Sequence, residues 1–163
     1  MLKKIMFSLL TLIMLYSTAA VVYRIFEPRD NNESVPAEFY LDYESLKEYL
    51  VSTGEGSIHY LFFSSRTNAD CQYVMYSVMP TVNQDENIQI GKLIEPVDIT
   101  KLEKDMTTNR LMDEWGIASF PAFAAVHIEN GTVVIDNTLQ YDTGRPMKAE
   151  EIEEWLKLNG LIS

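Results

Sequence analysis

Runs of apolar residues along the chain alternate with stretches in which apolar residues recur at helical spacing. Residues 58–63 (IHYLFF) are almost entirely apolar, which is typical of a strand covered on both faces. Between residues 71 and 82 the apolar positions follow each other at intervals of three and four, so we expect a helix with one core-facing side. Residues 121–128 and 132–135 form two further apolar runs, and Asn130-Gly131 between them predicts a β-hairpin.

Weaker periodicity places the remaining elements. It predicts helices near residues 43–52 and 107–115 and a strand at 88–97. At 148–158 an apolar stripe accompanies four glutamates in the first half of the segment, where they suit the N-terminal end of a helix dipole. Pro80 should kink its helix, because proline removes the hydrogen bond to the carbonyl four residues earlier. This order of elements predicts an α/β domain with a mixed central sheet and helices on both faces.

The N-terminal segment is apolar enough to enter a membrane. Residues 5–23 contain no charged side chain, and a spanning helix needs roughly 17–25 residues. Lys3 and Lys4 precede this run, which favours an N-terminus inside the cell and the rest of the chain outside. The alternative is a cleaved signal peptide with its cleavage site at Ser17-Thr18-Ala19, although apolar residues continue past this site to Tyr23.

These features divide the chain into three parts. We expect residues 1–29 to form a transmembrane signal anchor, residues 30–37 (DNNESVPA) a polar linker, and residues 38–163 the folded domain. The expected localisation is therefore the cell membrane, crossed once, with the C-terminal domain extracytoplasmic.

Acidic residues concentrate in the folded domain. The whole chain has 13 Lys and Arg against 24 Asp and Glu, a net charge of −11. After residue 29 nine basic and 23 acidic side chains remain, a net charge of −14. The clustered Lys and Arg that phosphate binding requires are missing, which argues against nucleic acid as a partner. Cys71 is the single cysteine, so no disulfide can form within the chain.

Two motifs resemble those of the thioredoxin fold, and the resemblance covers the region from about residue 42 to 160. The stretch 115–121 (WGIASFP) matches the approach to the family's cis proline, which implies that Pro121 is cis and that the backbone of Phe120 is offered to extended substrates. Residues 66–72 (RTNADCQ) are similar to the redox loops of exported bacterial members, with Asn68 where the first cysteine belongs. The residues alone leave an ordinary trans proline at position 121 open.

The departures from this family bear on chemistry. Thiol–disulfide exchange needs an attacking thiolate, which Asn68 cannot supply, and Cys71 corresponds to the resolving thiol. Phe62 takes the place of the family's buried acidic proton acceptor. A helix N-terminus would lower the pKa of the Cys71 thiol, whereas Asp70 and an apolar setting would raise it. Enzymatic dithiol turnover is therefore not expected, and Cys71 is either a core residue or a thiol for mixed disulfides with a partner.

No cofactor or metal is expected. Cys71, Met75 and Met79 are soft ligands on successive helical turns that could suit Cu(I), but core packing explains the same positions. His59 and His127 lie in predicted strands without the ligand spacing of a zinc site.

Two functions remain open. The first is a membrane-anchored thioredoxin-like protein associated with thiol–disulfide processes, with Cys71 as its thiol. The second is a redox-inactive binding or chaperone subunit that holds an extended segment of an exported or membrane protein. The candidate residues that contact such a partner are Asn68, Ala69, Asp70, Phe120 and Pro121.

Overall fold

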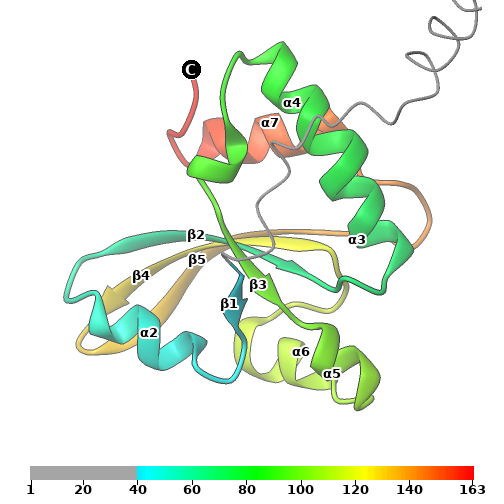
Figure 1. The fold of residues 1–163 in the computed structure, drawn as a ribbon. Helices are drawn as coiled ribbons and strands as arrows, with labels where there is room; N and C mark the ends of the chain where they lie inside the picture. The colour runs from blue at the N-terminus through cyan, green and yellow to red at the C-terminus, as the bar shows by residue number, and fades with distance from the viewer. Residues whose placement is uncertain (1–39) are drawn as a thin grey trace, which may run out of the picture. The chain divides into compact units, whose positions relative to one another are not determined.

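The computed structural model describes residues 40–163 (Figure 1). The predicted signal anchor at 1–29 and the predicted linker at 30–37 lie outside these residues. Within residues 40–163, none of the helices combines the length and the apolar character that a bilayer span requires.

A five-stranded mixed sheet forms the centre of the domain, in the order β1-β3-β2-β4-β5. β1, β3 and β2 are parallel, while β4 runs antiparallel to β2 and β5 antiparallel to β4. This order and these directions are those of the thioredoxin-like fold, so the predicted α/β fold is confirmed for residues 40–163. The strands are β1 (Leu41–Asp42), β2 (Ile58–Ser64), β3 (Glu95–Asp98), β4 (Ala122–Glu129) and β5 (Thr132–Gln140).

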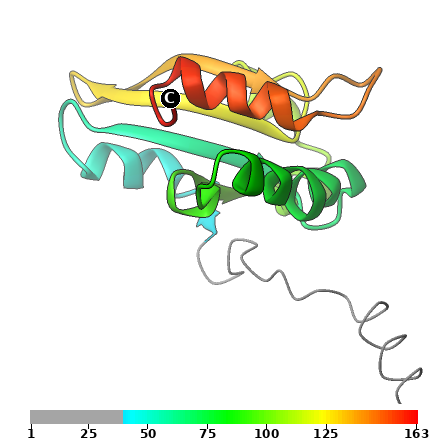
Figure 2. The same ribbon diagram turned by 90° about the horizontal axis from the view of Figure 1, so that it is seen from above.

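Helices cover both faces of the sheet, as expected (Figure 1). One face carries α2 (Leu46–Ser52), α5 (Thr100–Lys104) and α6 (Asn109–Trp115). The other carries a long helix and α7 (Ala149–Leu158), which lie side by side in Figure 2. The long helix consists of α3 (Ala69–Tyr73), a π-helical turn (Val74–Val78) and α4 (Met79–Asp85).

β2 connects the two cores, because its successive side chains point to opposite faces. On one face Phe63 packs against Trp115, with 5.2 Å between ring centroids. On the other face Phe62 stacks on Phe123 at 4.7 Å, and Phe123 contacts Trp155 at 5.4 Å. The apolar run that predicted a strand buried on both faces is explained by these two clusters.

Several predicted boundaries were wrong. The expected strand at 88–97 is a strand only over Glu95–Asp98, and Ile90–Lys92 forms a 3₁₀ turn. The side-chain oxygen of Asn83 accepts a hydrogen bond from the Ile90 N–H at 2.7 Å, which binds this segment to α4 instead of to the sheet. The second hairpin strand continues to Gln140, and β1 and α5 were not predicted because they have only two and five residues.

The helix around Pro80 adapts by a local change of hydrogen-bond pattern. Proline has no N–H, so the carbonyl of Tyr76 loses its α-helical partner. Immediately before Pro80 the chain forms the π-helical turn, in which the N–H of Met79 reaches the carbonyl of Val74, five residues back. The irregularity expected at Pro80 is thus present as a π-turn.

Truncating the central ring of one core should destabilise the domain strongly. Phe62→Ala is expected to reduce the free energy of unfolding by about 3–5 kcal/mol, because it removes a fully buried aromatic side chain. Ile58→Ala on the same strand is the control, since Ile58 is 60% exposed, and should cost less than about 1 kcal/mol. Urea denaturation followed by the fluorescence of the buried tryptophans measures both. Equal losses for the two variants would contradict this account of the core.

Candidate functional site

The loop between β2 and α3 occupies the position of the family's redox loop, and Asn68 ends it. The side-chain oxygen of Asn68 accepts hydrogen bonds from the backbone N–H groups of Asp70 at 2.9 Å and Cys71 at 3.1 Å. Asn68 is therefore the N-cap of α3, in the extended backbone conformation that this position favours. The role of the Asn68 side chain in this loop is thus structural.

The amide of Asn68 is also held from its other side. Its side-chain NH₂ donates to the Glu103 carboxylate at 3.1 Å, and Thr67 donates to the same carboxylate at 3.0 Å. The buried hydroxyl of Ser65 is a third donor to Glu103. We call Ser65, Thr67, Asn68 and Glu103 the Glu103 cluster. It ties the loop to α5, which lies on the opposite face of the sheet from α3.

Hydrogen bonding determines the charge state of Glu103. Burial opposes its ionisation, but the hydrogen bonds from Ser65, Asn68 and Thr67 outweigh burial and hold the pKa of Glu103 below its ordinary value. The cluster is therefore a carboxylate that is satisfied by three neutral donors.

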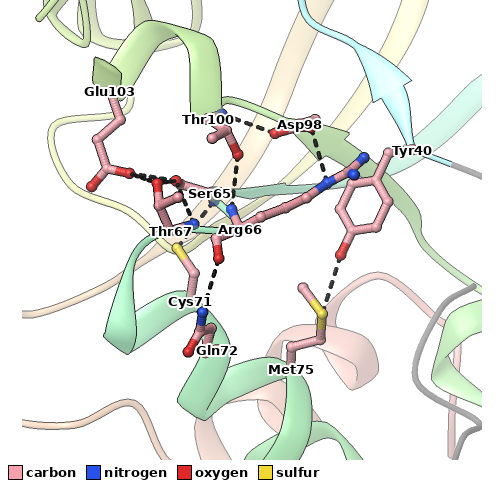
Figure 3. A network of polar contacts seen from close by, with 10 residues as sticks. All are labelled: Tyr40, Ser65, Arg66, Thr67, Cys71, Gln72, Met75, Asp98, Thr100 and Glu103. Atoms are coloured by element: carbon pink, nitrogen blue, oxygen red, sulfur yellow. Dashed lines mark hydrogen bonds and ion pairs between the residues drawn. The ribbon is translucent and has the colours of Figure 1, made fainter. Parts of the chain in front are cut away.

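Arg66 fixes the outer side of the same loop (Figure 3). Its Nε pairs with Asp98 at 3.1 Å, and its guanidinium lies over the ring of Tyr40, 4.8 Å from the centroid. The backbone N–H of Arg66 donates to the Thr100 hydroxyl at 2.8 Å, and its carbonyl accepts from the Gln72 side chain at 2.8 Å. With the Glu103 cluster on one side and Arg66 on the other, the loop is pre-organised.

Cys71 lies behind this loop with no solvent exposure. Its Sγ accepts a hydrogen bond from the backbone N–H of Ser65 at 3.3 Å. Burial, with smaller contributions from the Glu103 and Asp70 carboxylates, raises the pKa of the Cys71 thiol to about 12. At neutral pH only about one molecule in 10⁵ then carries a thiolate, so the group is a poor nucleophile.

The Phe120-Pro121 peptide bond is cis, as the resemblance implied. Pro121 is buried, and its carbonyl accepts from the Tyr141 N–H at 3.0 Å. Among residues 40–163, neither the N–H nor the C=O of Phe120 has a hydrogen-bond partner. Phe120 therefore presents both an unpaired donor and an unpaired acceptor next to the sheet.

Tyr141 connects the two parts of the site. Desolvation and the neighbouring Asp70 carboxylate raise the pKa of the Tyr141 hydroxyl, while its backbone bonds to Pro121. The structure thus brings together the predicted residues Asn68, Asp70 and Cys71, and it places the Pro121 backbone near Asp70 through Tyr141. Ala69 is exposed between them.

Two residues of this site were missed by the sequence reasoning. Glu103 is 35 residues from Asn68 and lies on a five-residue helix, so no local pattern indicates the contact. Tyr141 follows the last residue of β5, where the predicted strand had already ended. Asp98 and Thr100 give a weak signal for α5, since the Asp98 side chain accepts from the Thr100 N–H at 2.9 Å.

The possible metal ligands have other partners. Among the residues described, no group of three or more His, Cys, Asp or Glu side chains is placed to hold a metal ion. Met75, one of the three ligands of the Cu(I) hypothesis, accepts a hydrogen bond from the Tyr40 hydroxyl at 3.1 Å. His59 is buried and contacts Glu95 at 2.6 Å, and His127 contacts Asp136 at 2.8 Å.

Comparisons with known proteins return thioredoxin-fold structures of low sequence identity. The oxidised C-terminal domain of DsbD from Neisseria meningitidis has 18% identity and a TM-score of 0.47, covering 74% of this chain and 98% of that one. Thioredoxin f2 of Chlamydomonas reinhardtii has 15% identity and a TM-score of 0.45, covering 74% and 94%. A thioredoxin from Thermus thermophilus has 16% identity and a TM-score of 0.44, covering 76% of this chain and 88% of that one.

By sequence, no protein-family model matches the chain, and no curated protein matches it. The assignment of the fold therefore rests on the strand order and directions described above.

Removing the N-cap should loosen the loop. Asn68→Ala is expected to lower the free energy of unfolding by about 1–2 kcal/mol, because it leaves the first N–H groups of α3 without their cap and removes one of the three donors to the Glu103 carboxylate. Asn109→Ala, at an exposed position on α6, is the control and should stay within about 0.5 kcal/mol. Chemical denaturation measures both, and an unchanged midpoint for Asn68→Ala would contradict the capping role.

The stability of the fold should depend on pH through the ionisation of Glu103. Its folded pKa is lowered, so the cluster stabilises the fold above the unfolded value near 4.5 and loses this contribution as the pH falls through the folded value. Glu103→Gln should consequently destabilise the protein more at pH 7 than at pH 3. Glu48→Gln, an exposed change on α2, should show no such difference. Denaturation midpoints at the two pH values provide the measurement, and a Glu103→Gln loss that is independent of pH would contradict the prediction.

Proposed function

We propose that this protein is a membrane-anchored, extracytoplasmic thioredoxin-like protein that acts in thiol–disulfide processes by binding a partner, without dithiol turnover of its own. The observation that carries this proposal is the state of Asn68. Its amide stands where an attacking thiolate is needed, and both of its ends are engaged, by the N-terminus of α3 and by Glu103. An amide held in this way can stabilise a loop but cannot open a disulfide.

The two other groups that the exchange reaction needs support the same conclusion. Cys71 is fully buried and its raised pKa disfavours the thiolate. Phe62, at the place of the acidic proton acceptor, is fully buried and stacked on Phe123. The phenyl ring of Phe62 cannot accept a proton.

Partner binding is supported by the free backbone of Phe120. An extended segment can add to exposed, unpaired N–H and C=O groups in the manner of a β-strand. Phe120 has both groups unpaired among residues 40–163 and is only half-buried. We propose that the partner is an exported or membrane protein, since the sequence predicts an anchor that holds the domain outside the cell.

Mixed-disulfide formation is the second candidate for Cys71. It is favoured by the hydrogen bond that the Ser65 N–H donates to Sγ, which stabilises a thiolate against the effect of burial. In this case another protein would supply the missing thiol, and the sulfur would have to become exposed when the partner binds.

Restoring the first cysteine tests the absence of turnover. We expect the natural chain to show no catalysis of insulin reduction by dithiothreitol, and the Asn68→Cys variant to gain measurable activity, because it recreates a Cys-x-x-Cys loop on an intact fold. A double variant, Asn68→Cys with Cys71→Ala, is the matched control and should again be inactive. Activity of the natural chain at the level of a dithiol enzyme would overturn the proposal.

The natural chain and a single variant, Cys71→Ala, distinguish the two roles of Cys71. Thiol trapping in membranes followed by non-reducing gels should show no partner adduct for a binding protein, and Cys71→Ala should leave partner association unchanged. A Cys71-dependent adduct would instead establish the mixed-disulfide function.

A further inference from the structure

The long helix that follows the loop carries no charge over fourteen residues. Between Asp70 and Asp85 every side chain is neutral, although 24 acidic and 13 basic residues are distributed over the whole chain. The interval covers the end of α3, the π-helical turn and nearly all of α4. A neutral stretch of this length is expected for a buried helix, but this helix is buried on one side only.

The outer side of the helix is exposed, and its polar side chains bond only locally, Gln72 to the Arg66 carbonyl and Thr81 to the Ser77 carbonyl. Tyr76 is 61% exposed and Tyr73 is 46% exposed, and neither hydroxyl forms a hydrogen bond with the residues that the structure describes. Gln72, Ser77 and Thr81 are exposed beside them. We call Gln72, Tyr73, Tyr76, Ser77 and Thr81 the neutral face. Its residues combine aromatic surface with amide and hydroxyl groups.

This composition is that of the centre of a protein–protein interface. Interface centres are depleted in charge and enriched in tyrosine, while charged residues lie at the rim. The neutral face has this arrangement, since Asp70 adjoins its first end, and Asp85 and Glu86 adjoin the other. Tyrosine is also among the residues that contribute most to binding energy.

The neutral face continues the proposed binding edge. Asp70 is one helical turn before Tyr73, and Asp70 neighbours Tyr141, whose backbone bonds to Pro121. A partner segment paired with the Phe120 backbone can therefore extend its contacts over this helix. Tyr40, where the described chain begins, also contacts the helix through Met75.

The occupant that these observations favour is a membrane-resident protein. Only ten residues (30–39) separate the end of the predicted anchor from Tyr40, a span of at most about 36 Å when fully extended. A lipid surface is disfavoured, because the face has neither the basic residues nor the Trp, Phe or Leu of interfacial helices. A second copy is disfavoured because each domain carries acidic residues at both ends of the face and a charge of −14 after residue 29.

We propose that the neutral face of the α3–α4 helix docks an uncharged extracytoplasmic surface of a membrane protein. This inference rests on the proposed function, and it specifies the partner's class and the surface of this chain that it contacts. Association through a neutral surface should depend little on ionic strength, since the attraction is not between opposite charges.

Site-specific photo-crosslinking of the full chain in its own membranes tests the proposal. A benzophenone-bearing phenylalanine analogue replaces Tyr73, Tyr76 or, to probe the binding edge separately, Phe120. The control position is Met112 on α6, which is 56% exposed on the other face of the sheet. We expect one integral membrane protein to be crosslinked from positions 73, 76 and 120 and not from 112, with a yield that is nearly unchanged between low and high salt.

Glutamate substitutions in the neutral face test the proposal quantitatively, through the yield of the crosslinked adduct. With the crosslinker at Phe120, Tyr76→Glu should reduce the adduct at least about tenfold, because it places a charge in the centre of the interface. Met112→Glu should have no effect, and Thr81→Glu is a second variant on the same face. Retained denaturation midpoints show that the exposed substitutions leave the fold intact.

Each other outcome contradicts a stated part of the inference. Two outcomes would overturn the neutral face as a docking surface and leave the proposed function standing. One is an adduct from position 120 with none from positions 73 or 76. The other is an adduct from position 120 whose yield is unchanged by Tyr76→Glu and by Thr81→Glu. No adduct from any of the three positions would overturn both. An adduct with a second copy, an adduct with lipid alone, or a yield that collapses in high salt would overturn the chemistry assigned to the partner.

Discussion

The side-chain amide of Asn68 joins α3 to α5, two helices that lie on opposite faces of the sheet. Its oxygen accepts the first N–H groups of α3, and its nitrogen donates to Glu103 on α5. A cysteine side chain at this position could not do both, because a thiol is a weak donor and a weak acceptor. Asparagine at this position therefore supplies a contact on each side of the loop.

Phe62 also contributes to stability, in the core on the α3–α4 and α7 side of the sheet. A buried carboxyl group in an apolar layer is destabilising unless it is paired, whereas a phenylalanine stacked on Phe123 contributes apolar burial. Cys71, with its sulfur satisfied by a backbone N–H, behaves as a small core residue. Asn68, Phe62 and Cys71 each contribute contacts that stabilise the fold. In the proposed function these contacts would provide the rigid scaffold that a binding surface needs.

The sequence allowed the main layers to be predicted, because they depend on local patterns. The run at 58–63, the Asn130-Gly131 turn and the periodic helix after Cys71 all produced the expected elements. The strand expected at 88–97 failed because a side chain of α4 binds its first half. β1 is too short for any periodicity to indicate, and only pairing with β3 makes it a strand. The Asn68–Glu103 contact is likewise a product of the fold, since 35 residues separate its partners.

The acidic charge of the domain and the uncharged helix between Asp70 and Asp85 have different effects on binding. An acidic domain repels anionic partners over about a Debye length, roughly 8 Å at physiological ionic strength, and this repulsion acts before any contact forms. At contact distance the helix between Asp70 and Asp85 offers no charge to be desolvated, so binding there avoids the cost of burying unpaired ions. In the docking proposed above, long-range exclusion would come from the acidic surface and short-range contact from Tyr73 and Tyr76, which are different residues. Because they are separate, selectivity against anionic partners can be retained while the neutral face changes to fit a particular one.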